Sequence, residues 1–206
     1  MERDPVERRE AHKAFWQWFL ANRDTVYDRH HEQAYWVEIN RQVHLAEPVL
    51  WEVIPAAQGP RGLRFSAGGL IQHMDAVLRL AASAPEIPGW RILTFKPARE
   101  DTDFGVDGSG LYPDLPVKRM EVPSTLFEWR PNGDGIDIAV YVKGVTRENA
   151  KAHLGVFLLL LDGLLGEYTT MTLIKSVGMN PLDAAPPEAR PLRELASLAR
   201  AGLPVA

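Results

Sequence analysis

Two carboxylates inside the most apolar stretch of the chain are the residues best suited to acid–base chemistry. Asp162 and Glu167 lie in GVFLLLLDGLLGEYTTMTLI, residues 155–174. Asp162 is expected near the C-terminus of a helix, where its charge meets the unfavourable end of the helix dipole. A half-buried carboxylate needs a partner or a raised pKa, and two acids in different environments can divide the acid and base roles. The structural alternative is that Asp162 accepts hydrogen bonds from loop amides or an indole.

A second candidate site is the irregular stretch 97–123, which is rich in proline, glycine and acids. Phe104, Leu111 and Tyr112 lie there close to Asp103, and aromatic rings can anchor a partner while the acidic rim stays wet. The acids would steer a basic partner. Two other interpretations remain: the loop covers the protein's own core, or it forms a homo-oligomer contact. In an enzyme, Asp103 is a third acid that could join the pair above.

Other chemistries find little support in the residue pattern. The chain has no Cys, which excludes thiolate ligands and nucleophiles. A calcium loop that begins at Asp103 would put Gly105 at the third ligand position and Asp114 where a glutamate is required. His30 and His31 are adjacent, so on a helix they point about 100° apart and cannot easily share one ion. No GxSxG, P-loop or GxGxxG motif occurs. We therefore predict no metal and no cofactor.

Composition favours a soluble protein with a substantial core. Of the 206 residues, 46% are hydrophobic and 24% are charged, and the net charge is −4. This acidic balance, without Lys/Arg clusters, argues against a nucleic-acid surface. The apolar run 156–161 is shorter than the ~20 residues that a membrane span needs, and the charged N-terminus shows no signal peptide. We expect a cytoplasmic protein with no nucleic acid and no membrane partner.

Apolar spacing predicts an α+β fold. The sequence indicates helices over 5–26, 30–45, 70–83, 146–165 and 192–201, and strands over 49–54, 63–67, 90–96 and 167–177. Between the third and fourth helices, NGDG at 132–135 supplies the turn of a hairpin. The second strand of this hairpin alternates strictly: Ile136, Ile138, Val140 and Val142 share one face, and Asp137, Ala139, Tyr141 and Lys143 share the other.

Residues 49–96 and 125–177 share the order hairpin, helix, strand. We therefore predict two ββαβ-like units forming mostly antiparallel sheet, with two N-terminal helices packed alongside. The predicted division is an N-terminal helical segment (1–48), an α+β domain of two units joined by loop 97–123 (49–180), and a Pro/Ala-rich tail with a short helix (181–206).

Four segments of the sequence are distinctive: the Trp/Phe-rich helix FWQWF, the short FSAGG, and the segments APEIPGWRILTFKP and FLLLLDGLLGEYTTMTLI. Together they resemble an uncharacterised family of bacterial proteins. The resemblance covers most of residues 15–177. It implies a bacterial protein but no activity, and no catalytic residue follows from it.

Because no nucleophile or cofactor motif is present, we expect a non-catalytic binding or protein-interaction module. Its contact surface is predicted to include residues 98–122, with a protein partner or a second copy as the occupant. The alternative is a carboxylate-dependent enzyme of the hydrolase type that uses Asp162 and Glu167.

Overall fold

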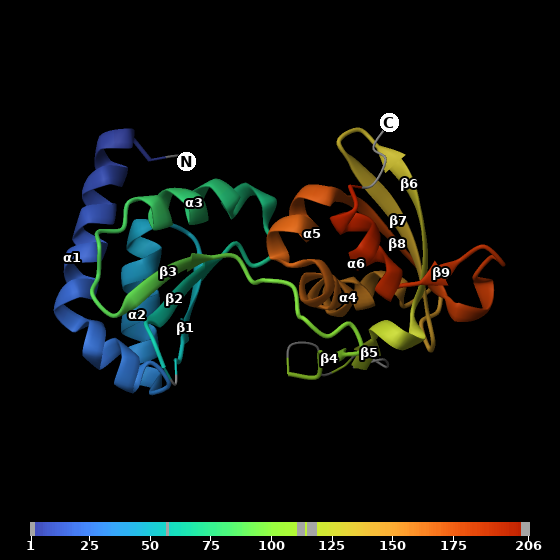
Figure 1. The fold of residues 1–206 in the computed structure, drawn as a ribbon, viewed down its shortest axis with the longest axis horizontal. Coiled ribbons are helices and arrows are strands. Elements are labelled where there is room, and N and C mark those ends of the chain that lie inside the picture. The colour runs from blue at the N-terminus through green and yellow to red at the C-terminus, as the bar shows by residue number, and fades with distance from the viewer. Residues whose placement is uncertain (1–2, 57, 111–113, 115–118, 203–206) are drawn as a thin grey trace. The chain divides into compact units, whose positions relative to one another are not determined.

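The computed structural model describes residues 3–56, 58–110, 114 and 119–202 (Figure 1). The chain forms two compact units, Met1–Phe95 and Lys96–Ala206. Helices and sheets occur together, so the predicted α+β class is confirmed. The boundary at Phe95 differs from the predicted division. The N-terminal helices belong to the first unit, and the segment after residue 181 belongs to the second.

In the first unit, the residues that the structure describes form two long helices, a three-stranded sheet and one further helix. Its elements are α1 (Pro5–Arg29), α2 (Gln33–Ala46), β1 (Leu50–Ile54), β2 (Arg61–Ser66), the 3-10 turn η1 (Ile71–His73), α3 (Met74–Ala82) and β3 (Trp90–Thr94). The strand order is β1-β2-β3. β1 and β2 pair antiparallel, and β3 pairs parallel to β2. The sheet is therefore mixed.

Aromatic side chains join the N-terminal helix to this sheet. Phe15 and Trp16 of α1 meet Phe65 of β2 edge-on, with ring centroids 6.1 and 5.9 Å apart. Phe19 meets Trp90 of β3 at 5.0 Å. The helix begins as predicted, because Asp4 accepts a hydrogen bond from the Val6 N–H at 2.7 Å. These buried rings explain why the helices are not a separate segment.

The described residues of the second unit form a four-stranded sheet, a two-stranded ribbon and three α-helices. Its elements are β4 (Gly105–Asp107), β5 (Arg119–Glu121), η2 (Val122–Ser124), β6 (Leu126–Asn132), β7 (Gly135–Val142), α4 (Ala150–Leu165), α5 (Glu167–Leu173), β8 (Ile174–Pro181), η3 (Leu182–Ala184), β9 (Arg190–Pro191) and α6 (Arg193–Arg200). The order in the larger sheet is β8-β7-β6-β9, and β8 pairs parallel to β7 while the other pairs are antiparallel.

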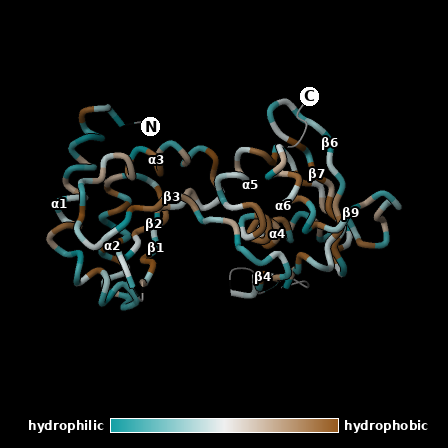
Figure 2. The backbone as a smooth tube through the Cα atoms, in the orientation of Figure 1, coloured by the Kyte–Doolittle hydropathy of each residue, from teal (hydrophilic) through white to brown (hydrophobic). Residues whose placement is uncertain are grey.

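One face of the larger sheet makes the core of the second unit. Ile136, Ile138 and Val140 of β7 are buried against apolar side chains of α4 and α6, as the alternation predicted. Figure 1 shows α4, α5 and α6 on the same side of the strands, and Figure 2 shows that α4 is largely hydrophobic. Leu192 and Leu195, in the predicted tail, are fully buried in this core.

The predicted strand over 167–177 is wrong in its first half, because residues 167–173 form the helix α5. β-branched residues in TTMT favoured a strand, but local contacts override that preference. Gly166 has a φ of 83°, which lets the chain turn sharply after α4. The Thr170 hydroxyl then donates to the Gly166 carbonyl at 3.0 Å inside the new helix. The strand β8 begins only at Ile174.

No single helix in the described part of the chain is long and apolar enough to cross a membrane. The pair α4 and α5 reaches that length and composition together, but the two helices meet at a bend of 112°.

Candidate functional site

The corner between α4 and α5 brings the two sequence-predicted acids together. Glu167 is the first residue of α5, and its side chain is fully buried. The Glu167 carboxylate accepts a hydrogen bond from the Lys96 N–H at 3.0 Å, and the Glu167 N–H donates to the Lys96 carbonyl at 2.9 Å. Gly166, at the corner, lets residues 96–98 pass close to the backbone. Any other residue there would place its Cβ 3.0 Å from the Ala98 nitrogen. Glu167 therefore fastens the chain at Lys96 to the start of α5.

Asp162 lies on α4 one turn before this corner and is partly buried. Burial and the nearby Glu167 carboxylate raise the pKa of Asp162 to about 6, while a hydrogen bond from Thr170 and the charge of Lys96 act in the opposite direction. A carboxyl with such a pKa can exchange a proton near neutral pH. Because Glu167 is fully buried, its carboxylate cannot touch a substrate in this conformation.

The described part of the loop covers the core of the second unit. Phe104 is 7% exposed and belongs to the buried apolar cluster there. Its ring packs against α4 at Gly163, where an added Cβ would lie 2.7 Å from the ring. The Arg99 guanidinium lies over the ring, 4.7 Å from its centroid. The Phe104 ring is thus occupied within its own unit and does not form an exposed anchor.

The other predicted loop residues are placed differently. Asp103 is exposed, and its backbone N–H donates to the Asp101 carboxylate at 2.7 Å in a local turn. Leu111 and Tyr112 lie outside the described residues. The structure brings Asp162 and Glu167 together.

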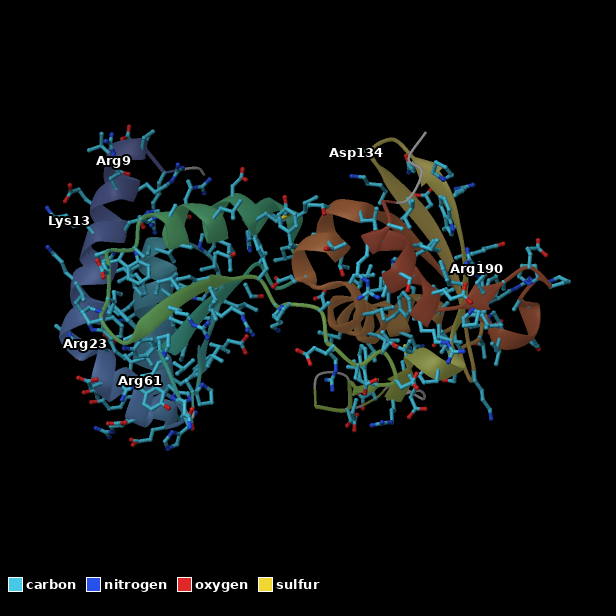
Figure 3. The ribbon with its side chains drawn as sticks, viewed as in Figure 1. Arg9, Lys13, Arg23, Arg61, Asp134 and Arg190 are labelled. Atoms are coloured by element: carbon cyan, nitrogen blue, oxygen red, sulfur yellow. The ribbon has the colours of Figure 1, made fainter. Side chains whose placement is uncertain are left out.

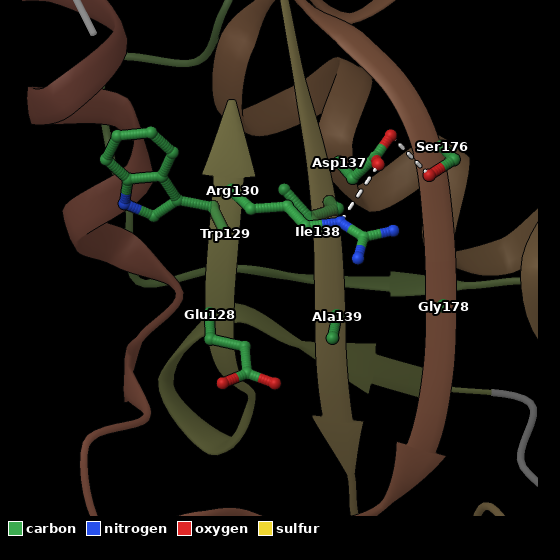
Figure 4. Close-up of a pocket in the computed structure, with 8 residues that line it drawn as sticks. All are labelled: Glu128, Trp129, Arg130, Asp137, Ile138, Ala139, Ser176 and Gly178. Carbon is green, nitrogen blue, oxygen red and sulfur yellow. Dashed lines mark hydrogen bonds and ion pairs between the residues drawn. The ribbon is translucent and has the colours of Figure 1, made fainter. Parts of the chain in front are cut away.

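A different surface stands out on the sheet face opposite α4 and α6 (Figure 4). The strand register aligns Glu128, Ala139 and Gly178 in one row across β6, β7 and β8. Arg130 and Asp137 lie in the next row, beside Ser176. A cavity of about 480 Å³ opens over these two rows, lined by Glu128, Trp129, Arg130, Asp137, Ile138, Ala139, Ser176 and Gly178. We call this cavity the sheet groove.

Hydrogen bonds fix the polar side chains around the sheet groove. Asp137 accepts bonds from Asn132 at 2.9 Å, Ser176 at 2.6 Å and Arg130 at 3.1 Å. The bonds from Asn132 and Ser176 hold the pKa of Asp137 below its usual value, with a further contribution from Arg130. At the other border, the Tyr141 hydroxyl donates to Glu128 at 2.6 Å.

The hydrogen bond to Glu128 and the burial of the ring raise the pKa of Tyr141 to about 12, and the charge of Glu188 acts in the same direction. The phenol therefore stays protonated at neutral pH and orients the Glu128 carboxylate. The sequence predicted that Asp137, Ala139 and Tyr141 share a face. It did not predict Glu128 and Gly178 beside them, because strand pairing determines those neighbours.

A third cluster, in the first unit, was not predicted from the sequence. His12 and Glu47 are both 6% exposed, and the His12 Nε2 lies 3.0 Å from the Glu47 Oε1. The Arg79 Nε donates to the same oxygen at 3.2 Å, and the Arg8 Nε lies 3.8 Å away. The only local signal was a carboxylate at Glu47 directly after the end of α2, where negative charge is unfavourable.

Neither metal-binding groups among the described side chains nor similarity to known proteins gives a role for the three sites. In the ranges that the structure describes, no group of three His, Asp or Glu side chains could hold a metal ion. Comparisons with protein-family models, curated proteins and solved structures found no match to this chain.

Proposed function

We propose that the chain is a non-catalytic binding module that recognises a basic segment of a partner protein in the sheet groove. One observation carries this proposal. In the row across the three strands, the small residues Gly178 and Ala139 lie side by side, and the carboxylate of Glu128 stands at the end of the row. Small side chains leave a trough, and a Lys or Arg side chain lying along it would meet Glu128 at its end. An ionised acceptor makes the stronger kind of hydrogen bond to such a cation.

The charges around the sheet groove support a basic occupant. Glu128 and Asp137 border the groove, and Glu188 lies near Tyr141 beside it. Arg130 is the cation of the lining, and its side chain is 80% exposed. Carboxylates therefore outnumber cations, so association should be faster at low salt and weaker at high salt. The sequence pattern also predicts a basic partner. We now propose that this partner binds in the sheet groove and not at the loop 98–122.

We also propose that the two units are ββαβ repeats of one plan. In each unit a hairpin precedes a helix, and the strand after the helix pairs parallel to the second hairpin strand. This common pairing supports the repeat. The sheet groove lies on the repeat in the second unit.

A pair of matched variants tests the binding proposal. Ala139→Arg places bulk and positive charge on the floor of the groove, and Ala152→Arg adds the same side chain to an exposed position on α4. Both variants and the wild type would be used as baits in the native host, with bound proteins quantified by mass spectrometry. We expect a specific partner to be lost from Ala139→Arg and kept by Ala152→Arg. Equal recovery with all three baits would contradict the proposal.

A carboxylate-dependent enzyme is the second candidate, and the raised pKa of Asp162 beside Glu167 favours it. A panel of ester, amide and phosphoester substrates would test it, with Asp162→Asn as the variant. We expect no turnover that depends on Asp162. Turnover that disappears in a folded Asp162→Asn variant would favour the enzyme instead.

A further inference from the structure

Two helices of the first unit bring basic side chains to one buried carboxylate at the end of a third. Glu47 follows α2, Arg8 and His12 come from α1, and Arg79 comes from α3. Glu47 and His12 are each more than nine-tenths buried, and Glu47 accepts from both His12 and Arg79. An ionised carboxylate has only acceptor sites, so the His12 Nε2 is the donor of this bond.

This arrangement fixes the arginines in position. A buried carboxylate at a helix C-terminus is costly without cations around it, so Glu47 holds Arg8 and Arg79 near itself. Arg3 is held independently, because its Nη1 donates to the carbonyls of Leu45 and Ala46 at 2.6 and 2.8 Å. The guanidinium groups are thus ordered before any ligand arrives, which reduces the entropy lost on binding.

A cavity of about 500 Å³ lies over the cluster. Its lining consists of Arg3, Arg8, His44, Glu47, Pro48, Gln72, Asp75, Ala76 and Arg79. The three arginines outnumber the two carboxylates, so the lining carries an excess of positive charge. Glu47 engages Arg79 through Nε, and a guanidinium has further N–H donors at its two Nη atoms. A planar fork of this kind matches the oxygens of a carboxylate or a phosphate.

We propose that this cavity binds an oxyanion, the carboxylate or phosphate group of a small molecule, through Arg79, Arg8 and Arg3. Glu47 is the anchor that orients the cations, and the anion is their second acceptor. His44 donates its Nδ1–H to the Asn40 carbonyl at 2.8 Å, and its ring lines the same cavity, where it reports on a bound ligand. This site is independent of the sheet groove and of the partner proposed there.

The test is a titration of the full chain with inorganic phosphate and, separately, with succinate. Sodium chloride would keep the ionic strength constant, so that screening does not imitate binding. The readouts are the thermal midpoint and the NMR signals of the arginine Nε–H groups and the histidine rings. We expect a saturable stabilisation by at least one anion, with shifts at Arg79 and His44. If neither anion gives a saturable change, the proposal is overturned.

Variants separate a specific site from general attraction. Arg79→Gln should weaken the affinity about tenfold or more, because a charge-assisted pair of hydrogen bonds is lost. Arg79→Lys keeps the charge beside Glu47 and should still weaken binding, because the planar fork is gone. The control is Arg23→Gln (Figure 3). Arg23 lies on α1 like Arg8, about 20 Å further along the helix, so this variant removes a positive charge far from the cavity. Wild-type affinity in both Arg79 variants, or an equal loss in Arg23→Gln, would overturn the site.

Discussion

Replacing Asp162 by Asn should stabilise the protein at neutral pH, and the gain should depend on pH. The folded state raises the pKa of Asp162 from 3.8 to about 6 through burial and the nearby Glu167. A carboxyl whose folded pKa is raised contributes stability below its unfolded pKa, and that contribution is lost as the pH rises through the folded value. Asparagine has nearly the same shape without the charge. It therefore removes the loss of folding stability that the ionised Asp162 carboxylate causes above pH 6.

The magnitude follows from the size of the shift. About two pKa units at about 1.4 kcal/mol each give about 3 kcal/mol as an upper limit. Asp162 is only partly buried, so solvent screening reduces the figure by roughly half, to about 1.5 kcal/mol. We expect the Asn variant to gain this much at pH 8 and progressively less as the pH falls from 6 towards 4.

Urea unfolding of the wild type and Asp162→Asn at a series of pH values measures the effect. The m-values should agree, so that a change in midpoint reports stability. Two results would refute the electrostatic reasoning. One is an Asn variant that is less stable than the wild type at pH 8. The other is a difference between the two proteins that does not change between pH 4 and pH 8.

Three further substitutions test other contacts in the same unfolding assay. Phe104→Ala should cost roughly 3 kcal/mol because the ring is buried against α4, and a cost below about 1 kcal/mol would mean that the ring is not in the core. Glu167→Leu should cost about 1–3 kcal/mol because it leaves the Lys96 N–H without its acceptor, and unchanged stability would contradict that bond. Glu38→Gln should cost a few tenths of a kcal/mol of folding stability at neutral pH. The reason is that hydrogen bonds from Arg41 and then Gln42 lower the pKa of Glu38 to about 2. This cost should fade as the pH falls towards 2, whereas Asp162→Asn gives a gain that fades between pH 6 and pH 4; a cost that does not fade would refute it.

Elements that depend on local signals were predictable from the sequence. Asp4 before Pro5 marked the start of α1, and the apolar residues before Gly166 marked α4 and its end. The alternation along β7 identified its buried face. Residues 167–173 were assigned to a strand because Thr and Met tracts favour strands locally. In the structure this segment is a helix, and hydrogen bonds to the carbonyls of Gly166 and Lys96 hold its first turn in place.

The candidate sites were harder to predict than the helices and strands, because most of them join residues that are far apart in the sequence. Asp162 and Glu167 are close in sequence, and their proximity could be predicted from one helix and its end. The His12–Glu47 bond joins residues 35 positions apart, and no periodicity links them. The sheet groove needs three strands in register, so Glu128 and Gly178 become neighbours of Ala139 only after β6 and β8 pair with β7. Sequence spacing within one element carries no information about such pairings.

An NMR titration with a short Lys/Arg-rich peptide tests the sheet groove most directly. Amide spectra of the wild type, Ala139→Arg and Ala152→Arg would be recorded at low salt and again at high salt. We predict saturable shifts centred on Ala139, Gly178 and Glu128, weakened by salt, abolished in Ala139→Arg and unchanged in Ala152→Arg. Shifts centred on other parts of the chain, or equal shifts in both variants, would contradict binding in the groove.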